Sequence, residues 1–208
     1  MKTDNALLII ALIAVVVSVA GAGITYNYIN AFKNKWPTGF ATGTVNLTVE
    51  SAASINFTTD EINWGSGRVN TGVDNATLST AGGANNITNG NWTGNTAGFV
   101  IENIGNENVT LEIATGKTAA TFISGTAGGG PSYRFNVSDN AEDGGCAFNV
   151  TEGDWNVVNT TSPGTLVCGP LNAADATDVV RIDVEVVIPS DSLIGELTDT
   201  FTATIALG

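Results

Sequence analysis

The chain has 208 residues and a net charge of −13, from 7 basic and 20 acidic residues, and it contains no histidine. Nucleic-acid binding needs clustered Lys and Arg, so this charge balance excludes a nucleic-acid partner. The lack of histidine excludes Ser-His-Asp and Cys-His catalysis, together with histidine-based metal sites. Beyond residue 36, four basic residues stand against nineteen acidic ones, which predicts a solvated acidic surface.

An uncharged apolar run from Ala6 to Ile24 dominates the first part of the chain. A helix of this length spans about 28 Å, close to the thickness of a bilayer core. In lipid the segment must be helical, because only a helix satisfies its own backbone hydrogen bonds. The sequence therefore predicts that residues 6–24 contact membrane lipid. Further copies of the same chain are the other partner that we expect.

The helical pattern continues beyond this run. An apolar residue recurs at every fourth position on one helix face, at Ile24, Tyr28, Phe32 and Trp36. We call these four residues the stripe. Pro37 and Gly39 predict the end of the helix. The expected domains are a hydrophobic helix and stalk over residues 1–36 and a surface domain over residues 37–208.

Three interpretations of the first domain remain open. The helix can be a retained signal anchor that holds a single copy. It can be a secretory signal that is cleaved at the small residues Ala20-Gly21-Ala22, with Lys2 as its basic start. It can also be an assembly helix whose stripe packs against neighbouring copies. No second apolar run follows, so we expect attachment to be N-terminal, with residues 37–208 extracellular.

The only two cysteines, Cys146 and Cys168, both lie in the second domain. An even cysteine count in an exported domain predicts a disulfide, and the alternative is a pair of buried thiols. A disulfide that closes a loop of this length stabilises a fold by about 3 kcal/mol on the chain-entropy estimate.

The sequence contains nine Asn-x-Ser/Thr triplets, more than its composition predicts by chance. They begin at Asn46, Asn56, Asn75, Asn86, Asn91, Asn108, Asn136, Asn149 and Asn159. Glycosylation at several of them is the functional interpretation, most readily at Asn75, Asn86, Asn91 and Asn159, which are expected in loops. The alternative is the general enrichment of Asn and Thr in β-rich surface proteins.

The second domain shows many short segments with the two-residue period of a half-buried strand. Residues 45–50 form the first such segment. Two hairpins are expected, one from 99–103 and 108–114, the other from 180–188 and 201–207. No helix of globular length is expected after residue 36. The predicted fold class is mainly β: a single β-sandwich-like extracellular domain on an N-terminal hydrophobic helix.

Candidate chemistry in this domain is sparse, and we expect neither catalysis nor a cofactor. One acidic loop offers a calcium candidate, formed by Asp139, Glu142 and Asp143. The loop departs from the EF-hand pattern, so the alternative is a solvated loop. A second candidate is a ligand surface in the loop-rich region 60–98, where Trp64 and Trp92 serve either recognition or core packing.

The layout of an apolar helix over Ala6–Trp36, followed by strand-rich residues 44–208 with sequons, resembles archaeal type IV pilin-like surface proteins. It is more distantly similar to exported β-sandwich fibre proteins of the camelysin type. Pilin precursors usually carry a basic and a small residue before the apolar run, where this chain has Thr3-Asp4-Asn5. The resemblance implies a non-catalytic surface protein, anchored singly or assembled into a filament through its helix. The alternative is a membrane-anchored adhesion module that recognises a glycan or a surface-layer partner.

Overall fold

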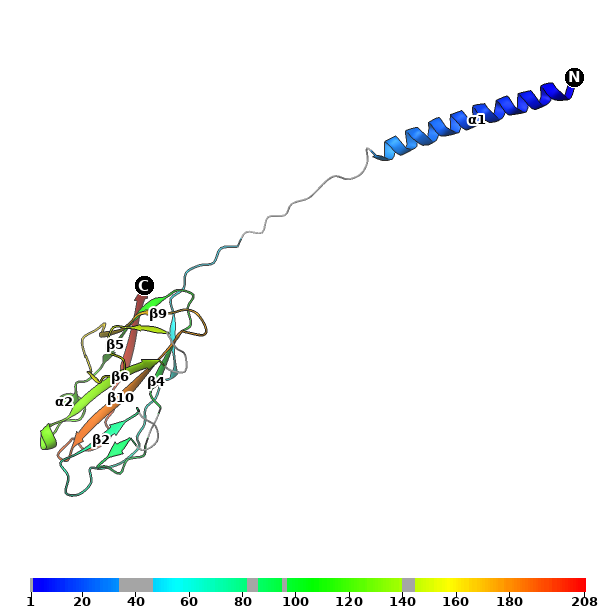
Figure 1. Ribbon diagram of the computed structural model, residues 1–208. Coiled ribbons are helices and arrows are strands. Elements are labelled where there is room, and N and C mark those ends of the chain that lie inside the picture. The colour runs from blue at the N-terminus through cyan, green and yellow to red at the C-terminus, as the bar shows by residue number, and fades with distance from the viewer. Residues whose placement is uncertain (1, 34–46, 82–85, 95–96, 140–144) are drawn as a thin grey trace. The chain divides into compact units, whose positions relative to one another are not determined.

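The computed structural model describes residues 2–33, 47–81, 86–94, 97–139 and 145–208. The chain separates into two compact units, Met1–Thr48 and Val49–Gly208. Helix α1 (Lys2–Lys33) belongs to the first unit, and the described strands all belong to the second, which we call the head (Figure 1).

Helix α1 contains the whole predicted apolar run. Two polar side chains follow that run, and each is satisfied within the helix. The Thr25 hydroxyl donates to the Gly21 carbonyl at 2.9 Å, and the Asn27 amide donates to the Gly23 carbonyl at 2.9 Å. Because these bonds need no water, the helix can carry both side chains into apolar surroundings. The predicted continuation to Trp36 lies outside the described residues.

The strands of the head form two antiparallel sheets. The larger sheet contains β1 (Ile55–Thr59), β4 (Phe99–Asn103), β10 (Val179–Pro189), β2 (Asn75–Ser79), β3 (Ile87–Thr88), β6 (Ser132–Asp139) and β8 (Asn156–Val157). The smaller sheet has the order β11 (Phe201–Leu207), β5 (Val109–Thr115), β9 (Thr165–Leu171) and β7 (Cys146–Phe148). Between β5 and β6 lie the short helix α2 (Ala119–Phe122) and the 3-10 turn η1 (Ala127–Gly129).

Strand β10 is the centre of the larger sheet. Along one edge it pairs with β6 from Val180 to Val187. Along the other edge it pairs first with β4, from Val179 to Ile182, and then with β2, from Glu185 to Pro189 (Figure 1). One strand therefore joins three others in an eleven-residue length.

The main hydrophobic core lies between the two sheets. Leu111 and Val167 enter it from the smaller sheet, and Ile101, Phe135 and Ile182 enter it from the larger sheet. This arrangement confirms the prediction of a mainly β domain on an N-terminal apolar helix. A second cluster contains Leu78 and Ile123, which pack with Tyr133 of β6 and with Val184 and Val186 of β10.

Both predicted hairpins are wrong in their pairing, although their strands exist. β4 pairs with β1 and β10, whereas the following strand β5 pairs with β9 and β11 in the other sheet. β10 and β11 are likewise in different sheets. The connections after β4 and β10 therefore carry the chain from one sheet to the other.

The predicted strand over residues 45–50 is also not observed. Its first two residues lie outside the described residues, and residues 47–54 have no regular structure. The described helices after residue 36 span only three or four residues, as expected for a domain without helices of globular length.

Candidate functional site

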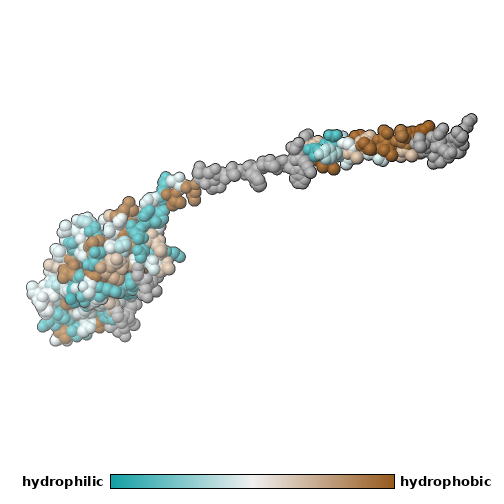
Figure 2. Space-filling view, turned by 45° about the horizontal axis from the view of Figure 1, so that its top comes forward, coloured by the Kyte–Doolittle hydropathy of each residue, from teal (hydrophilic) through white to brown (hydrophobic). Residues whose placement is uncertain are grey.

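Helix α1 is long and apolar enough to cross a membrane over Ile9–Ala31, a stretch of 23 residues. None of this surface is covered by the rest of the described chain, and Figure 2 shows it as a hydrophobic band that becomes hydrophilic toward the Lys33 end. A membrane span and a signal sequence both have this character. The apolar surface needs lipid or other helices to cover it.

The stripe begins on this exposed helix. Ile24 and Tyr28 are both exposed, one turn apart on the same face. Phe32 lies in α1, and its side chain is not described, while Trp36 lies outside the described residues. The structure thus places three of the four predicted positions on one helix and leaves Ile24 and Tyr28 uncovered.

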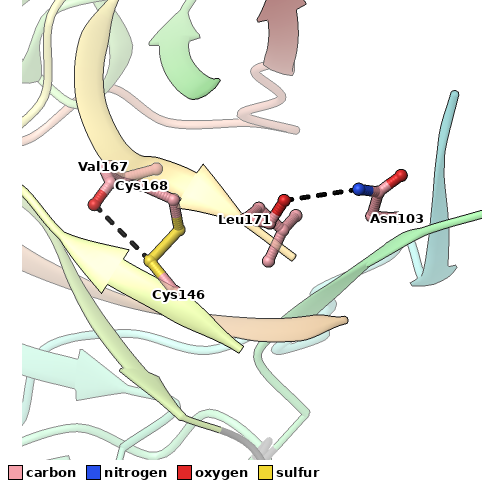
Figure 3. The surroundings of a disulfide bond; sticks show 5 residues. All are labelled: Asn103, Cys146, Val167, Cys168 and Leu171. Atoms are coloured by element: carbon pink, nitrogen blue, oxygen red, sulfur yellow. Dashed lines mark hydrogen bonds between the residues drawn. A yellow bond between two sulfur atoms is a disulfide. The ribbon is translucent and has the colours of Figure 1, made fainter. Parts of the chain in front are cut away.

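The predicted disulfide is present. Cys146 in β7 and Cys168 in β9 are bonded, with their Cα atoms 5.2 Å apart (Figure 3). Both residues are buried in the main core. The Cys146 Sγ also lies 3.6 Å from the Val167 carbonyl oxygen. An oxidised sulfur carries no proton, so we interpret this approach as a contact and not as a hydrogen bond. The disulfide fixes the three-residue strand β7 to β9 of the smaller sheet.

Asn103 ties the end of β4 to the smaller sheet. Its buried side-chain amide donates to the carbonyls of Glu107 at 2.9 Å, Leu171 at 3.3 Å and Asn172 at 3.0 Å. Figure 3 shows the bond to Leu171, which lies in the same strand as Cys168. Its side-chain oxygen accepts from the Gly105 N–H at 3.0 Å. This residue therefore satisfies the backbone where the chain passes between the sheets.

A shallow hollow of about 280 Å³ opens on the head beside an aromatic row. Its lining consists of Phe57, Asp60, Phe99, Asp199, Thr200 and Phe201. The ring centroids of Phe99 and Phe201 are 4.9 Å apart, and Tyr133 continues the row at 6.0 Å from Phe201. Apolar ring faces beside carboxylates can stack on a sugar ring and accept its hydroxyl protons.

Tyr133 is the buried member of this aromatic row. Burial raises the pKa of its hydroxyl, and the neighbouring Asp199 carboxylate raises the pKa further by its charge and by a hydrogen bond. Tyr133 therefore remains a proton donor at physiological pH. Asp199 also accepts the Lys117 backbone N–H at 3.3 Å. Its carboxylate is thus held in place by residues of the head.

The two tryptophans proposed for a ligand surface have structural surroundings. Trp64 and Trp92 are half-buried and pack against the second cluster. The Trp92 ring lies directly over Gly67 and Gly90, so closely that a Cβ on either glycine would collide with it. Only glycine leaves room for the ring at these two positions. These contacts support the core-packing alternative for Trp92.

The described sequons fall into two groups. Asn56, Asn91, Asn108 and Asn149 are exposed, and their side-chain nitrogens donate no hydrogen bond to the described residues. In contrast, the nitrogens of Asn75, Asn86 and Asn136 donate to the carbonyls of Gly128, Ala81 and Gly153. Half-buried Asn159 accepts the Thr161 N–H through its side-chain oxygen. Asn46 lies outside the described residues.

The calcium candidate is only partly visible. Asp139 is the last residue of β6, whereas Glu142 and Asp143 lie outside the described residues. Among the residues that the structure describes, no group of three or more Cys, Asp or Glu side chains could hold a metal ion.

The residues that line the hollow are dispersed along the sequence. Its phenylalanines follow the apolar alternation of three separate strands, a pattern that predicts core positions, and only the fold brings them together. No protein-family model matches the chain. Comparisons with curated proteins and with solved structures likewise gave no match.

Proposed function

We propose that this chain is a non-catalytic structural protein of a cell surface, held at a membrane by α1 and presenting the head outside. One observation carries the proposal: the apolar surface of α1 over Ile9–Ala31 is uncovered, and it belongs to a different compact unit from the head. Such a surface is stable in lipid or in a bundle of helices, and not in water. The shared core of the two sheets supports a β-sandwich-like head.

Two features of the head support an extracellular position. The buried Cys146–Cys168 disulfide is of a kind that persists in oxidising compartments and is rare in the cytosol. The four exposed sequon asparagines are free to accept glycan. Both features are those of exported proteins.

We further propose that copies assemble into a pilus-like filament through the stripe. Ile24 and Tyr28 lie exposed on one face, and Phe32 follows them one turn later. Full burial of a large apolar side chain stabilises a contact by about 1.5–3 kcal/mol, and a filament repeats the contact in every copy. A single anchor would cover Ile24 and Tyr28 with lipid, as part of Ile9–Ala31, whereas a filament would bury them between copies.

The variant Phe32→Asp tests assembly separately from membrane attachment. It leaves Ile9–Ala31 intact and places an unpaired charge on the stripe. The control is Asn30→Asp, which adds the same charge about half a turn away around α1 but inside the last turn of Ile9–Ala31, so polymer is compared only in samples where its membrane association is retained. Membrane association and sedimentable polymer are measured separately, with electron microscopy of sheared surface material.

We expect polymer to be lost in Phe32→Asp and kept in Asn30→Asp, with both variants retained in the membrane. Polymer that is unchanged in Phe32→Asp would exclude the stripe as the assembly surface. If the native host forms no polymer from the unmodified chain, the single-anchor form of the proposal stands instead.

The hollow supports a second candidate function, a membrane-anchored module that recognises a glycan. The half-buried rings of Phe57, Phe99 and Phe201 lie beside Asp60 and Asp199. Binding of the full chain to immobilised oligosaccharides would test this candidate. Asp60→Asn is the informative variant, because Asp60 is exposed and lines the hollow. Equal binding by the variant would exclude the hollow as the binding site.

A further inference from the structure

We propose that the hollow binds a protonated amine, which narrows the glycan of the second candidate function to one that carries an amino sugar. The inference rests on that candidate function, because it names the ligand of the same site. Three properties of the hollow support it: its position at the edges of the two sheets, its aromatic walls, and carboxylates that pair with no basic side chain of the described chain.

The hollow lies where an edge of one sheet meets an edge of the other. β1 is an end strand of the larger sheet, and β11 is an end strand of the smaller sheet. Phe57 comes from β1 and Phe99 from the adjacent β4, while Phe201 is the first residue of β11. All three rings pack on the main core and stay partly exposed. The hollow is therefore built on rigid strands and is open to a ligand from solvent.

Three phenylalanine rings line the hollow, and their planes differ in direction. The centroids of Phe57 and Phe99 are 5.8 Å apart with the ring planes at 79°, and the planes of Phe99 and Phe201 are at 45°. The face of an aromatic ring is the negative end of its quadrupole and attracts a cation within about 6 Å of the centroid. Rings set at such angles can contact one cation from more than one side, as in the aromatic cages that bind alkylammonium groups.

Two carboxylates line the hollow together with these rings. Asp60 is exposed and directly follows β1, and Asp199 lies two residues before the start of β11. Among the residues that the structure describes, neither carboxylate forms an ion pair with a Lys or Arg side chain. The Lys117 ammonium is directed elsewhere, because it donates to the Thr198 carbonyl and lies 5.8 Å from the centroid of the Phe122 ring. The negative charge of the hollow is thus available to a cationic ligand.

Asp199 is held in place without being neutralised. Its carboxylate accepts the Lys117 backbone N–H at 3.3 Å and a hydrogen bond from the Tyr133 hydroxyl. Both donors are uncharged, so the carboxylate keeps its charge. Gly116 leaves the room that this position needs, since a Cβ there would lie 2.7 Å from the Asp199 Oδ1. A group that is already fixed loses little conformational entropy when a ligand binds it.

The side chains of the hollow accept hydrogen bonds more than they donate them. The two carboxylates are acceptors only, and Thr200 has the one side-chain donor among the lining residues. An ammonium group offers three donors and no acceptor, so it matches this set. An anionic ligand would be repelled. The excess of acidic residues beyond residue 36 also attracts cations to the head.

The volume of the hollow limits the ligand to one small group. At about 280 Å³ it is smaller than the pockets of about 300–1,000 Å³ that hold drug-sized ligands. We expect a single terminal amino-sugar ring, with its ammonium group against the phenylalanine rings and one carboxylate. The other carboxylate can accept the hydroxyl protons of the sugar.

Ligand-observed NMR titrations test the proposal on the full chain, in a detergent that carries neither a sugar nor a choline head group. The probes are glucosamine, N-acetylglucosamine and choline. N-acetylglucosamine is the matched neutral sugar, because acetylation removes the charge of the same nitrogen. We expect glucosamine to bind with a dissociation constant about tenfold lower than that of N-acetylglucosamine. Added NaCl should reduce this difference, because salt screens the charge of exposed carboxylates.

The outcomes separate the inference from the candidate function on which it rests. Equal affinity for the two sugars would overturn the amine and keep the glycan candidate. Choline that binds as tightly as glucosamine would overturn the amino sugar in favour of an ammonium ligand without a sugar ring. If neither sugar binds, the inference is overturned, and the binding of immobilised oligosaccharides decides the glycan candidate separately.

Charge variants show whether binding occurs in the hollow. Asp60→Asn should weaken glucosamine binding about tenfold and leave N-acetylglucosamine binding nearly unchanged. The matched control is Glu61→Gln, which removes the same charge from the neighbouring exposed residue outside the lining. Glucosamine binding should survive in this control. An equal loss in both variants would indicate a general effect of charge and would overturn the hollow as the site.

Ring variants test the aromatic walls. Phe57→Leu keeps an apolar side chain and removes the ring, so it should weaken glucosamine binding more than N-acetylglucosamine binding. Phe148→Leu is the control, because Phe148 is also half-buried against the main core but does not line the hollow. The unfolding temperature of each variant is measured first. If Phe57→Leu does not fold, the exposed Asp60→Asn decides the proposal.

Discussion

Asp191 holds the backbone of Thr126. Its carboxylate accepts the Thr126 N–H at 2.9 Å and the Thr126 hydroxyl at 3.0 Å, and it accepts the Ala127 N–H at 3.0 Å. These bonds join the segment after β10 to the turn η1. They lower the pKa of Asp191, with the Ala127 N–H as the largest cause and the Thr126 N–H as the next.

This geometry predicts a pH-dependent effect of Asp191→Ala. A carboxyl whose pKa is lowered by folding contributes stability above its unfolded value of 3.8, and this contribution is lost as the pH falls through the folded pKa. We expect Asp191→Ala to lower the unfolding temperature at pH 7, with a difference that disappears toward pH 2. Asp175→Ala, at an exposed position, is the control. A difference that stays constant from pH 7 to pH 2 would contradict the assignment.

Asn103→Ala should destabilise the head. The substitution leaves up to three carbonyls without their side-chain donor, and an unsatisfied buried group costs about 1–3 kcal/mol. Denaturant unfolding of the full chain in detergent, followed by tryptophan fluorescence, measures the loss. The exposed Asn70→Ala should change the free energy of unfolding by less than about 0.5 kcal/mol. Equal effects of the two substitutions would show that Asn103 does not secure the crossing.

Removal of the disulfide by Cys146→Ala and Cys168→Ala together should lower the free energy of unfolding by about 3 kcal/mol on the chain-entropy estimate. Because the two cysteines are bonded to each other, thiol labelling of unreduced native protein should find no reactive cysteine even after denaturation. Two labelled thiols would contradict an oxidised, exported head. Loss of secondary structure after mild reduction should be greatest in the smaller sheet, which contains both cysteines.

Glycan should occur at Asn56, Asn91, Asn108 and Asn149 in preference to Asn75, Asn86 and Asn136. In the second group the nitrogen that would carry the sugar already donates a hydrogen bond to a backbone carbonyl. Intact mass of the protein from its native host, for Asn→Gln variants of each group, measures the distribution. A mass equal to that of the bare polypeptide would exclude glycosylation altogether.

Local patterns predicted the strands, because alternation reports which face of a strand is buried. β10 and β11 were identified in this way, from the alternation over residues 180–188 and 201–207. Which strands pair with one another depends on segments that are distant in sequence. The short connections after β4 and β10 wrongly suggested that consecutive strands form hairpins. The short connection between 99–103 and 108–114 suggested a hairpin, yet neither Gly105 nor Asn106 within it has the positive φ that a type I′ turn requires. Gly105 is instead needed because the Ala52 carbonyl lies where its Cβ would be.

The candidate sites also differ in whether the sequence alone could predict them. Two cysteines in one domain allow a single pairing, so their disulfide could be predicted from the sequence. The hollow could not, because its phenylalanines each obey the alternation of an ordinary core position. Asp60 and Asp199 are 139 positions apart in sequence and meet only through the sheet crossings.

The position of β10 in the chain has a consequence for biosynthesis. β2, β4 and β6 all precede it, and β2 lies about a hundred residues before its partner. A ribosome therefore releases three strands that have no common neighbour until residues 179–189 emerge. During that interval their edges are open to mispairing, and closure of the larger sheet is a late and non-local event. The larger sheet consequently cannot close until most of the head has been synthesised.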